Sequence, residues 1–416
     1  MTAPLRVAVL ARSVFPLHGV GGLERHVYDL VRHLTDAGTQ VTLITKAPTA
    51  DAKTVGDALR NVSLRTVPYT TFPFAGQRWT TILDRDTAYP LFGERAGRLA
   101  AQLVHEGTID IVHGLGASAL GYARRRTKSR APLVLNPQGL EEFGATDPAQ
   151  ARLKRAAYLP LRRAVLACAR AADRVIATDR ALEPAVLEHL HVPREKVRLV
   201  PNAIDVDAID RISASIEPGG LRSRMGIAPN DVVLLSVGRL EANKGFHVLA
   251  DALGALHAHG APLHGNWRWV LVGEGPHRGA IHQAIAAAQL DEHVLLRGRA
   301  SDDELHAWYE TATVFVHPTL YEGSSLVTLE AMAHRRVVVA TRAGGLPDKV
   351  RHNGTGWLVD AGRPDQLAAA ISGALARPDL LPDMGRAGRA LVEQEFAWPA
   401  VTRRLLDVYH ELQSRE

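Results

Sequence analysis

The stretch Val314-Phe-Val-His317, Pro318-Thr-Leu-Tyr321, Glu322-Gly-Ser-Ser-Leu-Val-Thr-Leu-Glu330 reads as a strand, a turn and a helix in succession. A short β-branched and aromatic run precedes the proline turn, and two serines precede an apolar helical pattern. In parallel α/β sheets such strand-to-helix loops lie at the carboxyl edge of the sheet, where ligands bind. We therefore expect this stretch to form part of a binding site in an α/β protein.

The same alternation of short β-branched runs and amphipathic segments continues through the chain, as is typical of parallel βαβ units. We predict strands at residues 7–11, 41–45, 109–113, 133–136, 174–177, 232–237, 269–272, 294–296, 314–317 and 337–340. We predict helices at 23–35, 93–105, 151–171 and 399–412, with Pro160 bending or splitting the third of these. Both halves of the chain are therefore predicted to be doubly wound.

The length of 416 residues is too great for one ordinary core and favours two domains. Hydrophobic residues make up 46% and charged residues 22%, which is typical of globular proteins. The segment 200–207 and the turn residues Pro218-Gly219-Gly220 suit a connection between domains. We predict a first domain at 1–205, a second at 206–396, and a last helix at 397–416 that crosses back to the first domain.

Localisation is predicted from short apolar runs and a single cysteine. The N-terminal apolar run 7–11 has arginine on both sides and suits a first strand, not a signal peptide. No uninterrupted apolar run in the sequence approaches the roughly 18 residues of a membrane span. Cys168 is the only cysteine, which excludes an intramolecular disulfide and a cysteine-built zinc site. We expect a cytoplasmic protein, with peripheral contact at the inner face of the membrane left open.

The formal charge of +5 is modest, but the basic residues are clustered. A solvated surface is the ordinary explanation of such clusters, and an acceptor-side surface for anionic lipid or a phosphorylated acceptor is the alternative. Nucleic acid is disfavoured because aromatic residues are not interleaved with the basic ones. The clusters are Arg124, Arg125, Arg126, Lys128 and Arg130, followed by Arg152, Lys154, Arg155, Arg162 and Arg163.

Two further loops join a predicted strand to a predicted helix. His18-Gly-Val-Gly-Gly-Leu-Glu-Arg25 is rich in glycine, but Glu24 replaces the final glycine of the dinucleotide fingerprint, so a tight turn explains it equally well. Val237-Gly-Arg-Leu-Glu-Ala-Asn-Lys-Gly245 places Arg239 and Lys244 at a sheet edge. Two cations in a glycine-bounded loop favour a diphosphate, which has charge to neutralise and several acceptor oxygens.

Glu322 and Glu330 occupy different parts of the opening stretch. Glu322 lies in the loop, whereas Glu330 falls inside the helix beside its apolar face. A carboxylate there needs hydrogen-bond donors, and ribose hydroxyls suit it, although an ordinary helix-surface glutamate is the alternative. One of the two serines is expected to cap the helix, whose N–H groups would face a ligand.

The two glutamates in Tyr-Glu322-Gly-Ser-Ser-Leu-Val-Thr-Leu-Glu330-Ala-Met-Ala resemble the signature of retaining family 4 glycosyltransferases with the GT-B fold. Further pieces match in the family's order, most strongly from residue 195 onward. They are Val200-Pro-Asn-Ala-Ile-Asp205, Gly238-Arg239 with Lys244-Gly245, Val272-Gly-Glu-Gly-Pro276 and Gly344-Gly345-Leu-Pro347. The resemblance implies two Rossmann-like domains facing across a cleft.

The resemblance also implies roles for individual residues. The C-terminal domain would hold a nucleoside-diphosphate sugar, with Arg239 and Lys244 on the diphosphate, Glu330 on the ribose and Glu322 on the sugar hydroxyls. The N-terminal domain would hold the hydroxyl acceptor, and retention is commonly assigned to front-face attack without a protein nucleophile. The remaining expected binding residues are Gly21, Gly22, Gly273, Glu274, Arg299 (through its main chain), Gly323, Ser324, Ser325, Leu326 and Val327.

The resemblance fits less well at the family's N-terminal histidine. The usual second histidine of His-x-His is Leu115 here. Another common position of the histidine is in a His-Gly pair after the next strand, and this sequence has Gln138-Gly139 there. His113 stays a catalytic candidate, with a strand-end histidine satisfied by packing as the alternative. No metal is expected, because two cations and a helix dipole would stabilise the leaving diphosphate. The Asp-x-Asp patterns at 84–86 and 205–207 could suggest a metal-dependent transferase, but they fall in a polar loop and the interdomain segment and are interpreted as incidental.

The sequence thus predicts a hexosyltransferase of cell-envelope glycan, glycolipid or glycoside biosynthesis, with no cofactor besides its donor. Two alternatives remain open at this point. One is another GT-B enzyme such as an epimerase or phosphorylase, and the other is a sugar-nucleotide-binding protein without transfer activity. The donor base and sugar, and the identity of the acceptor, are not encoded in any motif that we can interpret.

Overall fold

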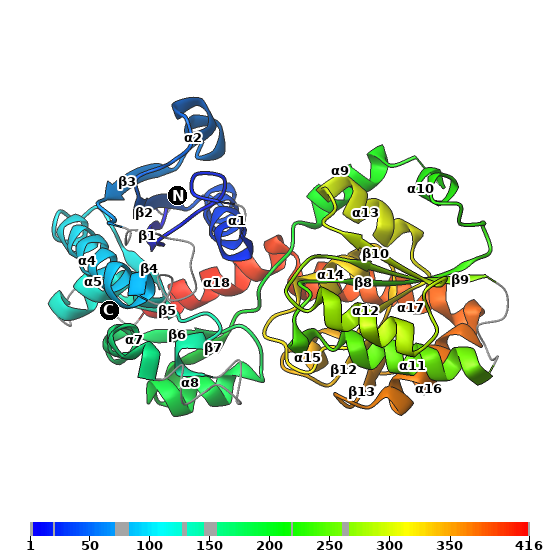
Figure 1. Ribbon diagram of the computed structural model, residues 1–416. Coiled ribbons are helices and arrows are strands. Elements are labelled where there is room, and N and C mark those ends of the chain that lie inside the picture. The colour runs from blue at the N-terminus through cyan, green and yellow to red at the C-terminus, as the bar shows by residue number, and fades with distance from the viewer. Residues whose placement is uncertain are drawn as a thin grey trace. The chain divides into compact units, whose positions relative to one another are not determined.

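The computed structural model describes residues 3–19, 21–70, 83–126, 131–144, 156–217, 219–259 and 266–414. The chain divides into two compact units, one made of Met1–Asn202 with Trp398–Glu416 and the other of Ala203–Ala397. Each unit holds one parallel sheet covered by helices (Figure 1). This arrangement confirms the predicted pair of doubly wound domains.

The first unit contains a seven-stranded sheet in the order β3-β2-β1-β4-β5-β6-β7. All of its described strand pairs are parallel. The strands are β1 (Arg6–Leu10), β2 (Gln40–Lys46), β3 (Ser63–Val67), β4 (Ile111–Leu115), β5 (Leu133–Asn136), β6 (Arg174–Ala177) and β7 (Val197–Leu199). The five strands predicted for this half are present, and β3 and β7 are additional.

The helices of the first unit, apart from the last, lie between consecutive strands, as βαβ winding requires. They are α1 (Gly22–Asp36), α2 (Ala52–Ala58), α4 (Tyr89–His105), α5 (Leu120–Arg125), α7 (Leu159–Ala171), α8 (Leu182–Leu190) and the final α18 (Trp398–Gln413). A π-helical turn at Asp84–Ala88 precedes α4, and 3-10 turns span Gly116–Ala119, Glu141–Phe143 and Arg194–Lys196. Pro160 lies in the first turn of α7, where its missing N–H is tolerated. Residues 156 and 157 are helical and Tyr158 forms a turn before α7, so the helix is split near Pro160 as predicted; residues 151–155 lie outside the described residues.

Helix α18 belongs to the first unit although it ends the chain. Glu411 on α18 bonds to Arg174 at 2.5 Å and to Arg198 at 2.7 Å. Hydrogen bonds from these two arginines lower the pKa of the Glu411 carboxyl to about 2. The predicted return of the last helix to the first domain is therefore confirmed, and an ion-pair cluster anchors it.

The second unit contains a six-stranded sheet in the order β10-β9-β8-β11-β12-β13, again with parallel pairs. Its strands are β8 (Val232–Val237), β9 (Trp267–Val272), β10 (Val294–Gly298), β11 (Val314–His317), β12 (Val337–Thr341) and β13 (Gly356–Val359). Its helices are α9 (Val206–Ser215), α10 (Gly220–Arg224), α11 (Phe246–His259), α12 (Arg278–Ala287), α13 (Asp302–Thr311), α14 (Leu326–Ala333), α15 (Leu346–Lys349), α16 (Pro364–Leu375) and α17 (Leu381–Leu391). Tighter turns span Ala242–Lys244 and Pro378–Leu380, and a π-helical turn spans Val392–Phe396.

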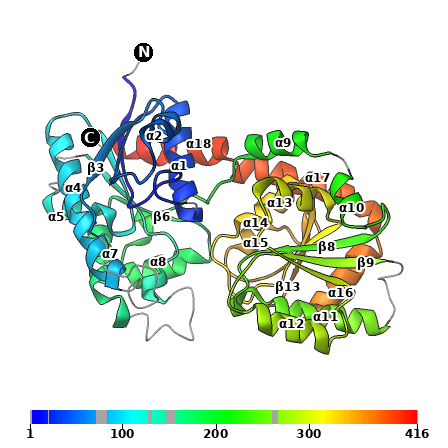
Figure 2. The same cartoon turned by 45° about the horizontal axis from the view of Figure 1, so that its top comes forward.

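Both faces of the second sheet are buried, because successive β8 residues enter different cores. Val233 and Leu235 pack with Trp308 on one face, whereas Leu234 packs with Phe246 on the other. Figure 2 shows the strands between a layer with α13 and α14 and a layer with α11, α12 and α16. Two covered faces explain why β8 is a continuous apolar run.

None of the helices that the structure describes is both long enough and apolar enough to span a membrane.

Candidate functional site

Glu322 is the centre of a polar cluster at the carboxyl edge of the second sheet. Its Oε2 atom lies 2.7 Å from Lys244 Nζ and 2.8 Å from His317 Nε2. The Gly323 N–H donates to the other oxygen, Oε1, at 3.1 Å. The Glu322 side chain is only 11% exposed and that of Lys244 only 16%. The loops after β8 and β11 therefore meet at one buried carboxylate.

The Glu322 carboxyl is held in its ionised form. Burial by itself would raise its pKa, but hydrogen bonds and charge from His317 and Lys244 outweigh burial and lower the pKa to about 2. Such a carboxylate has no proton to give near neutral pH and acts as a hydrogen-bond acceptor. A ligand rich in hydroxyl groups is the natural partner for it.

This cluster predicts a pH dependence of stability. The folded-state pKa of Glu322 lies below the ordinary 4.5, so its stabilisation is fully present above about pH 4.5 and is lost as the pH falls toward 2. This stabilisation amounts to about 3 kcal/mol. Urea unfolding at pH 6 and pH 3 should show a larger loss for the wild type than for Glu322→Gln. Equal losses in both proteins would contradict the ionised cluster.

Two glycines fix the backbone around this carboxylate. Gly344 has φ +51°, and a Cβ atom there would collide with the carbonyl oxygen of Glu322. Gly245 has φ +66°, and a Cβ atom there would collide with the carbonyl oxygen of Pro318. Both conformations favour glycine. The loop that carries Glu322 is thus in backbone contact with the loop that carries Lys244 and with the Gly344 turn.

The predicted helix start lies where it was expected, but its serine acts differently. Ser325 occupies the cap position of α14, yet its side chain accepts no backbone N–H. Its Oγ lies 2.9 Å from Thr328 Oγ1 instead. Ser324 Oγ is buried and has no hydrogen-bond partner among the described residues. First-turn N–H groups that no serine caps are suited to an anion.

Glu330 lies inside α14 and is half-buried, as its position beside the apolar face predicted. The Tyr309 hydroxyl donates to Glu330 Oε2 at 2.9 Å. Tyr309 is itself fully buried and stacks on His334, with ring centroids 5.2 Å apart. A tyrosine of the neighbouring helix therefore orients the carboxylate that the sequence assigned to ribose.

The two predicted cations of the β8 loop have different surroundings. Lys244 is buried against Glu322, whereas the Arg239 side chain is 78% exposed and pairs with Glu241 at 3.0 Å. Glu274 and Arg299 are exposed in the loops after β9 and β10. The Gly273 N–H donates to the Gly298 carbonyl at 2.9 Å, which joins these two loops. The structure brings Lys244 to Glu322 but leaves Arg239 at the surface.

Sequence reasoning missed His317 and Tyr309 as site residues. His317 ends β11 and is fully buried, and the orientation of Glu322 depends on it. Its place between a strand and the serine-rich loop was a usable signal. Tyr309 lies in α13 inside an ordinary amphipathic pattern and gave no such signal.

In the first unit, Gly21 and Gly22 start α1 and are exposed, while Val20 lies outside the described residues. Gly21 is the cap residue and has no side chain with which to satisfy the first-turn N–H groups. The glycine-rich loop therefore does open into a helix, as its sequence predicted. The carboxylate of Glu24, in the first turn of α1, lies close to the Gly21 backbone.

His113 lies inside the first unit. It belongs to β4 and is almost fully buried, and its Nδ1 atom is 2.6 Å from the Tyr409 hydroxyl of α18. Burial, with a smaller effect of His26, lowers the pKa of His113 to about 3. This environment matches the packing alternative for His113 more closely than the catalytic one.

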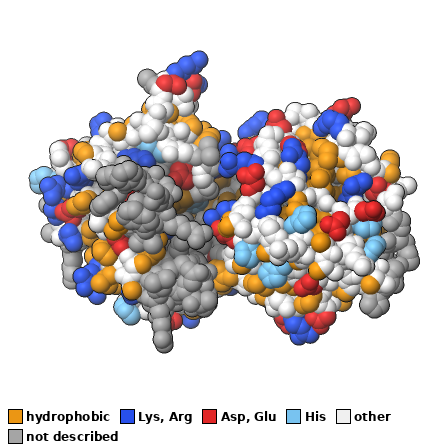
Figure 3. Space-filling view, in the orientation of Figure 1, with side chains coloured by type: hydrophobic (Ala, Val, Ile, Leu, Met, Phe, Trp, Pro, Cys, Tyr) orange, Lys and Arg blue, Asp and Glu red, His pale blue; other side chains and the backbone are white. Residues whose placement is uncertain are grey.

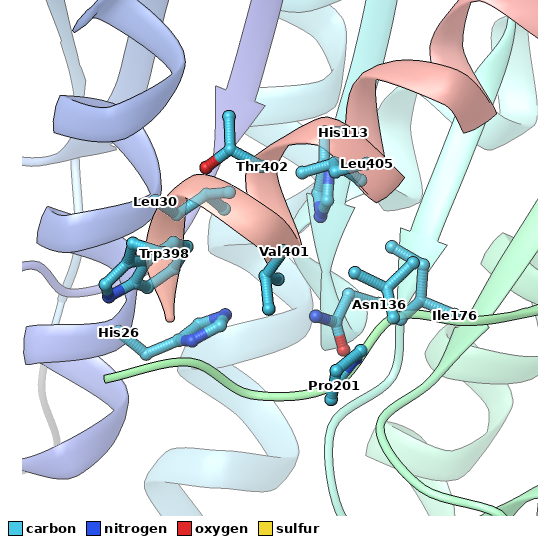
Figure 4. Close-up of a pocket in the computed structure, with 11 residues that line it drawn as sticks. His26, Leu30, His113, Asn136, Ile176, Pro201, Trp398, Val401, Thr402 and Leu405 are labelled. Atoms are coloured by element: carbon cyan, nitrogen blue, oxygen red, sulfur yellow. The ribbon is translucent and has the colours of Figure 1, made fainter. Parts of the chain in front are cut away.

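The other ring nitrogen of His113 borders a cavity between α1, α18 and the sheet (Figure 4). Within the described part of the chain, His113 Nε2, Trp398 Nε1 and Thr402 Oγ1 are buried and lack hydrogen-bond partners. The cavity measures about 20 Å³, which is enough for a single water molecule.

The basic cluster at the end of α5 is partly neutralised. Arg124 and Arg125 bond to Glu94 at 3.1 and 2.6 Å, and Arg126 pairs with Asp173 at 2.7 Å. In Figure 3, acidic and basic side chains are interspersed along the edge of the first unit where Figure 1 shows α4 and α5. These pairs favour the solvated-surface explanation. Lys128, Arg130, Arg152, Lys154 and Arg155 lie outside the described residues.

The Asp-x-Asp patterns have local roles. Asp84 accepts a hydrogen bond from the Tyr69 hydroxyl at 2.6 Å, and Asp205 caps α9 through the Ala208 N–H at 2.9 Å. Over the described ranges, no group of three or more His, Cys, Asp or Glu side chains is placed to hold a metal ion.

Two family models match the chain. The model described as Glycosyltransferase Family 4 matches residues 20–208, and the model described as Glycosyl transferases group 1 matches residues 231–377. The chain belongs to the family 4 glycosyltransferases. The resemblance read from the Glu322–Glu330 motif is thereby confirmed, and so is the prediction of a transferase enzyme.

Curated relatives of this glycosyltransferase carry related names. D-inositol 3-phosphate glycosyltransferase of Thermobispora bispora is 28% identical over 99% of this chain and 95% of that protein. GDP-mannose-dependent alpha-(1-6)-phosphatidylinositol monomannoside mannosyltransferase of Mycobacterium tuberculosis is 32% identical over 52% of this chain and 56% of that protein. The first relative covers both units of the transferase.

Solved structures share the fold of the transferase. Sucrose-phosphate synthase of Thermosynechococcus elongatus aligns with a TM-score of 0.72 at 22% identity, covering 99% of this chain and all of that one. Anabaena HepE in complex with UDP aligns with a TM-score of 0.71 at 22% identity, covering 98% of this chain and all of that one. These neighbours confirm the GT-B fold.

Proposed function

We propose that this glycosyltransferase moves a hexose, with retention of configuration, from a nucleoside-diphosphate sugar to a hydroxyl acceptor. The observation that carries the proposal is the ionised, buried Glu322 beside the start of α14. A fixed carboxylate suits the hydroxyl groups of a sugar, while Lys244 and the first-turn N–H groups suit the adjoining phosphate. Glu330, oriented by Tyr309, would accept from the ribose hydroxyls.

In this mechanism, the bond between the anomeric carbon and the phosphate oxygen breaks, and the acceptor oxygen bonds to the same face of the sugar. The departing phosphate oxygen takes the acceptor proton, so no protein nucleophile is needed. Lys244, Arg239 and the helix dipole would stabilise the charge that develops on the leaving group. We propose that these two cations and the helix dipole stabilise the leaving group in place of a metal ion.

The names of similar proteins support a nucleotide-sugar donor. One solved neighbour is Anabaena HepE in complex with UDP-glucose, and one relative is named for GDP-mannose. These names differ in both base and sugar. The donor of this enzyme is therefore a matter for a binding screen.

The decisive screen measures thermal stabilisation by UDP-, GDP-, ADP- and dTDP-sugars. We expect one base to raise Tm clearly, because a ligand at about 100 times its Kd stabilises the folded state by about 2.7 kcal/mol. Glu322→Gln should weaken the response to the sugar nucleotide more than the response to the free nucleoside diphosphate.

Incubation with the selected donor and an acceptor panel then tests catalysis. Transfer with release of nucleoside diphosphate excludes an epimerase and a binding protein without turnover. The anomeric coupling constant of the product, measured by NMR, tests retention. An inverted product, or no stabilisation by any of the four donor classes, would overturn the proposal.

A further inference from the structure

Two cations share one aromatic cluster at the carboxyl edge of the first sheet. Arg12 follows β1 and Lys46 ends β2. The Arg12 guanidinium carbon lies 5.0 Å from the centre of the Tyr89 ring, and Lys46 Nζ lies 5.4 Å from that of Tyr69. Arg12 Nη1 is also 3.5 Å from the Tyr69 hydroxyl. The two side chains are thus gathered at one place instead of diverging into solvent.

The carboxylate in contact with this cluster is Asp84. Its Oδ2 atom accepts from the Tyr69 hydroxyl at 2.6 Å and lies 3.8 Å from Arg12 Nη1. Burial lowers the pKa of Lys46, and the charge of Arg12 lowers it further, whereas Asp84 and Glu24 raise it. Lys46 and Arg12 thus repel each other in a half-buried place, and an anion bound beside both cations would offset that repulsion.

The cluster extends from the ends of β2 and β3 to the point where the winding of the sheet reverses. In the order β3-β2-β1-β4-β5-β6-β7, the chain moves outward in opposite directions from the neighbours β1 and β4. The Tyr89 hydroxyl donates to the carbonyl of Leu115 at the end of β4 at 2.8 Å. Gly116 follows with φ +55°, and a Cβ atom there would meet that hydroxyl. Ligands of open α/β sheets bind at such a switch point.

We propose that Arg12 and Lys46 bind a phosphate group carried by the acceptor. The inference deepens the proposed function, because it rests on the first unit holding the acceptor. Arg12 supplies a planar pair of donors and Lys46 a compact positive charge, a combination suited to a phosphate ester. The relative that spans both units has D-inositol 3-phosphate in its name. The acceptor class is therefore a polyol that bears a phosphate.

The test uses the full-length protein and does not depend on turnover. Tm is measured against inorganic phosphate with chloride at equal ionic strength as the control, and against D-inositol 3-phosphate with myo-inositol as the control. Wild type should be stabilised by both phosphate-bearing probes. Arg12→Gln and Lys46→Gln should each need at least about tenfold more probe, because each removes a charge-assisted hydrogen bond.

Arg170→Gln is the matched control, because it removes one exposed positive charge far from the proposed site. Arg170 lies at the end of α7, next to the amino end of β6, whereas Arg12 and Lys46 lie at the carboxyl edge of the sheet. It should bind the probes as the wild type does. Lys46→Arg should retain most of the binding. The nucleotide-sugar donor should raise the Tm of each variant by as much as it raises the Tm of the wild type. An equal shift shows that the variant is folded and keeps a working donor site.

A lipid source of the phosphate is tested by sedimentation with phosphatidylinositol vesicles, using phosphatidylcholine vesicles as the control. Binding that Arg12→Gln and Lys46→Gln abolish supports the site and assigns the phosphate to a lipid headgroup. Binding of D-inositol 3-phosphate alone supports the site and assigns it to a soluble acceptor.

Equal responses of wild type and variants to every probe, or no preference for phosphate over chloride, would overturn the site. Failure of transfer with intact phosphate binding would count against the proposed function instead.

Discussion

Glu322→Ala is expected to reduce kcat/KM for sugar transfer by at least about a hundredfold, and Lys244→Ala to do nearly the same. Each change removes a charge that is held in the cluster at 2.7 Å from its partner. Hydrogen bonds to charged groups contribute about 1.5–3 kcal/mol each, and Glu322 has two carboxylate oxygens to offer a sugar. Release of nucleoside diphosphate under conditions of limiting donor measures the effect.

The buried pair adds an effect on stability that a loop position alone does not predict. The loop positions of both residues, taken alone, predict that neither replacement unfolds the protein. Removing one partner of a buried ion pair leaves the other charge uncompensated and costs about 3–5 kcal/mol. We therefore expect Glu322→Ala to lower the free energy of unfolding substantially, although the large cores of the second unit stay intact.

Controls separate the two effects. Glu322→Gln keeps the shape of the side chain and should lose transfer while unfolding at a higher denaturant concentration than Glu322→Ala. Glu292→Ala removes an exposed glutamate in the turn before β10 and should change stability by less than about 0.5 kcal/mol. A double-mutant cycle with Lys244→Met should give a coupling energy of at least about 1 kcal/mol. Wild-type kcat/KM in Glu322→Gln would refute the assignment of this carboxylate to the donor sugar.

The fold was largely predictable because its central strands are buried on both faces. The run Val232–Val237, for example, has a single polar residue, Ser236, and is easily identified as a buried strand. The strands that were missed are β3, β7 and β13, and all three lie at sheet edges. Ser63–Val67 is partly exposed and carries an arginine and two hydroxyl residues in five positions. β7 has three residues and β13, although buried, has four. These strands were missed because their apolar runs are either interrupted by polar residues or too short to stand out.

The candidate site was predictable only one loop at a time. Glu322, Lys244 and Glu330 could be named because each lies in or beside a strand-to-helix loop. Their partners are set by how distant loops meet, since Lys244 and Glu322 are 78 positions apart and His113 and Tyr409 are 296 apart. No local pattern encodes that His113 would face α18. The same limit hid the Arg12–Lys46 cluster, whose members come from separate strands.

Gly344→Ala is expected to destabilise the second unit and to abolish transfer although it changes no polar side chain. Gly344 has φ +51°, which costs an L-residue about 1–2 kcal/mol. Its new Cβ would also collide with the Glu322 carbonyl oxygen, so the loop must move. Displacement of Glu322 from Lys244 and His317 should lower kcat/KM by at least about a hundredfold. Urea unfolding and donor-induced shifts in Tm measure the two effects.

Two other glycines serve as controls for Gly344→Ala. They test whether its effect comes from the collision with the backbone and not from the methyl group itself. Gly279 lies in α12 with open space around its Cβ position, so Gly279→Ala should stabilise the protein by about 0.5–1 kcal/mol. Gly323 is adjacent to Glu322 and also has open space, so Gly323→Ala should keep the free energy of unfolding. If Gly323→Ala loses transfer while staying stable, its methyl group blocks the donor at the start of α14. Wild-type stability and transfer in Gly344→Ala would instead show that the close approach of these two loops does not position Glu322.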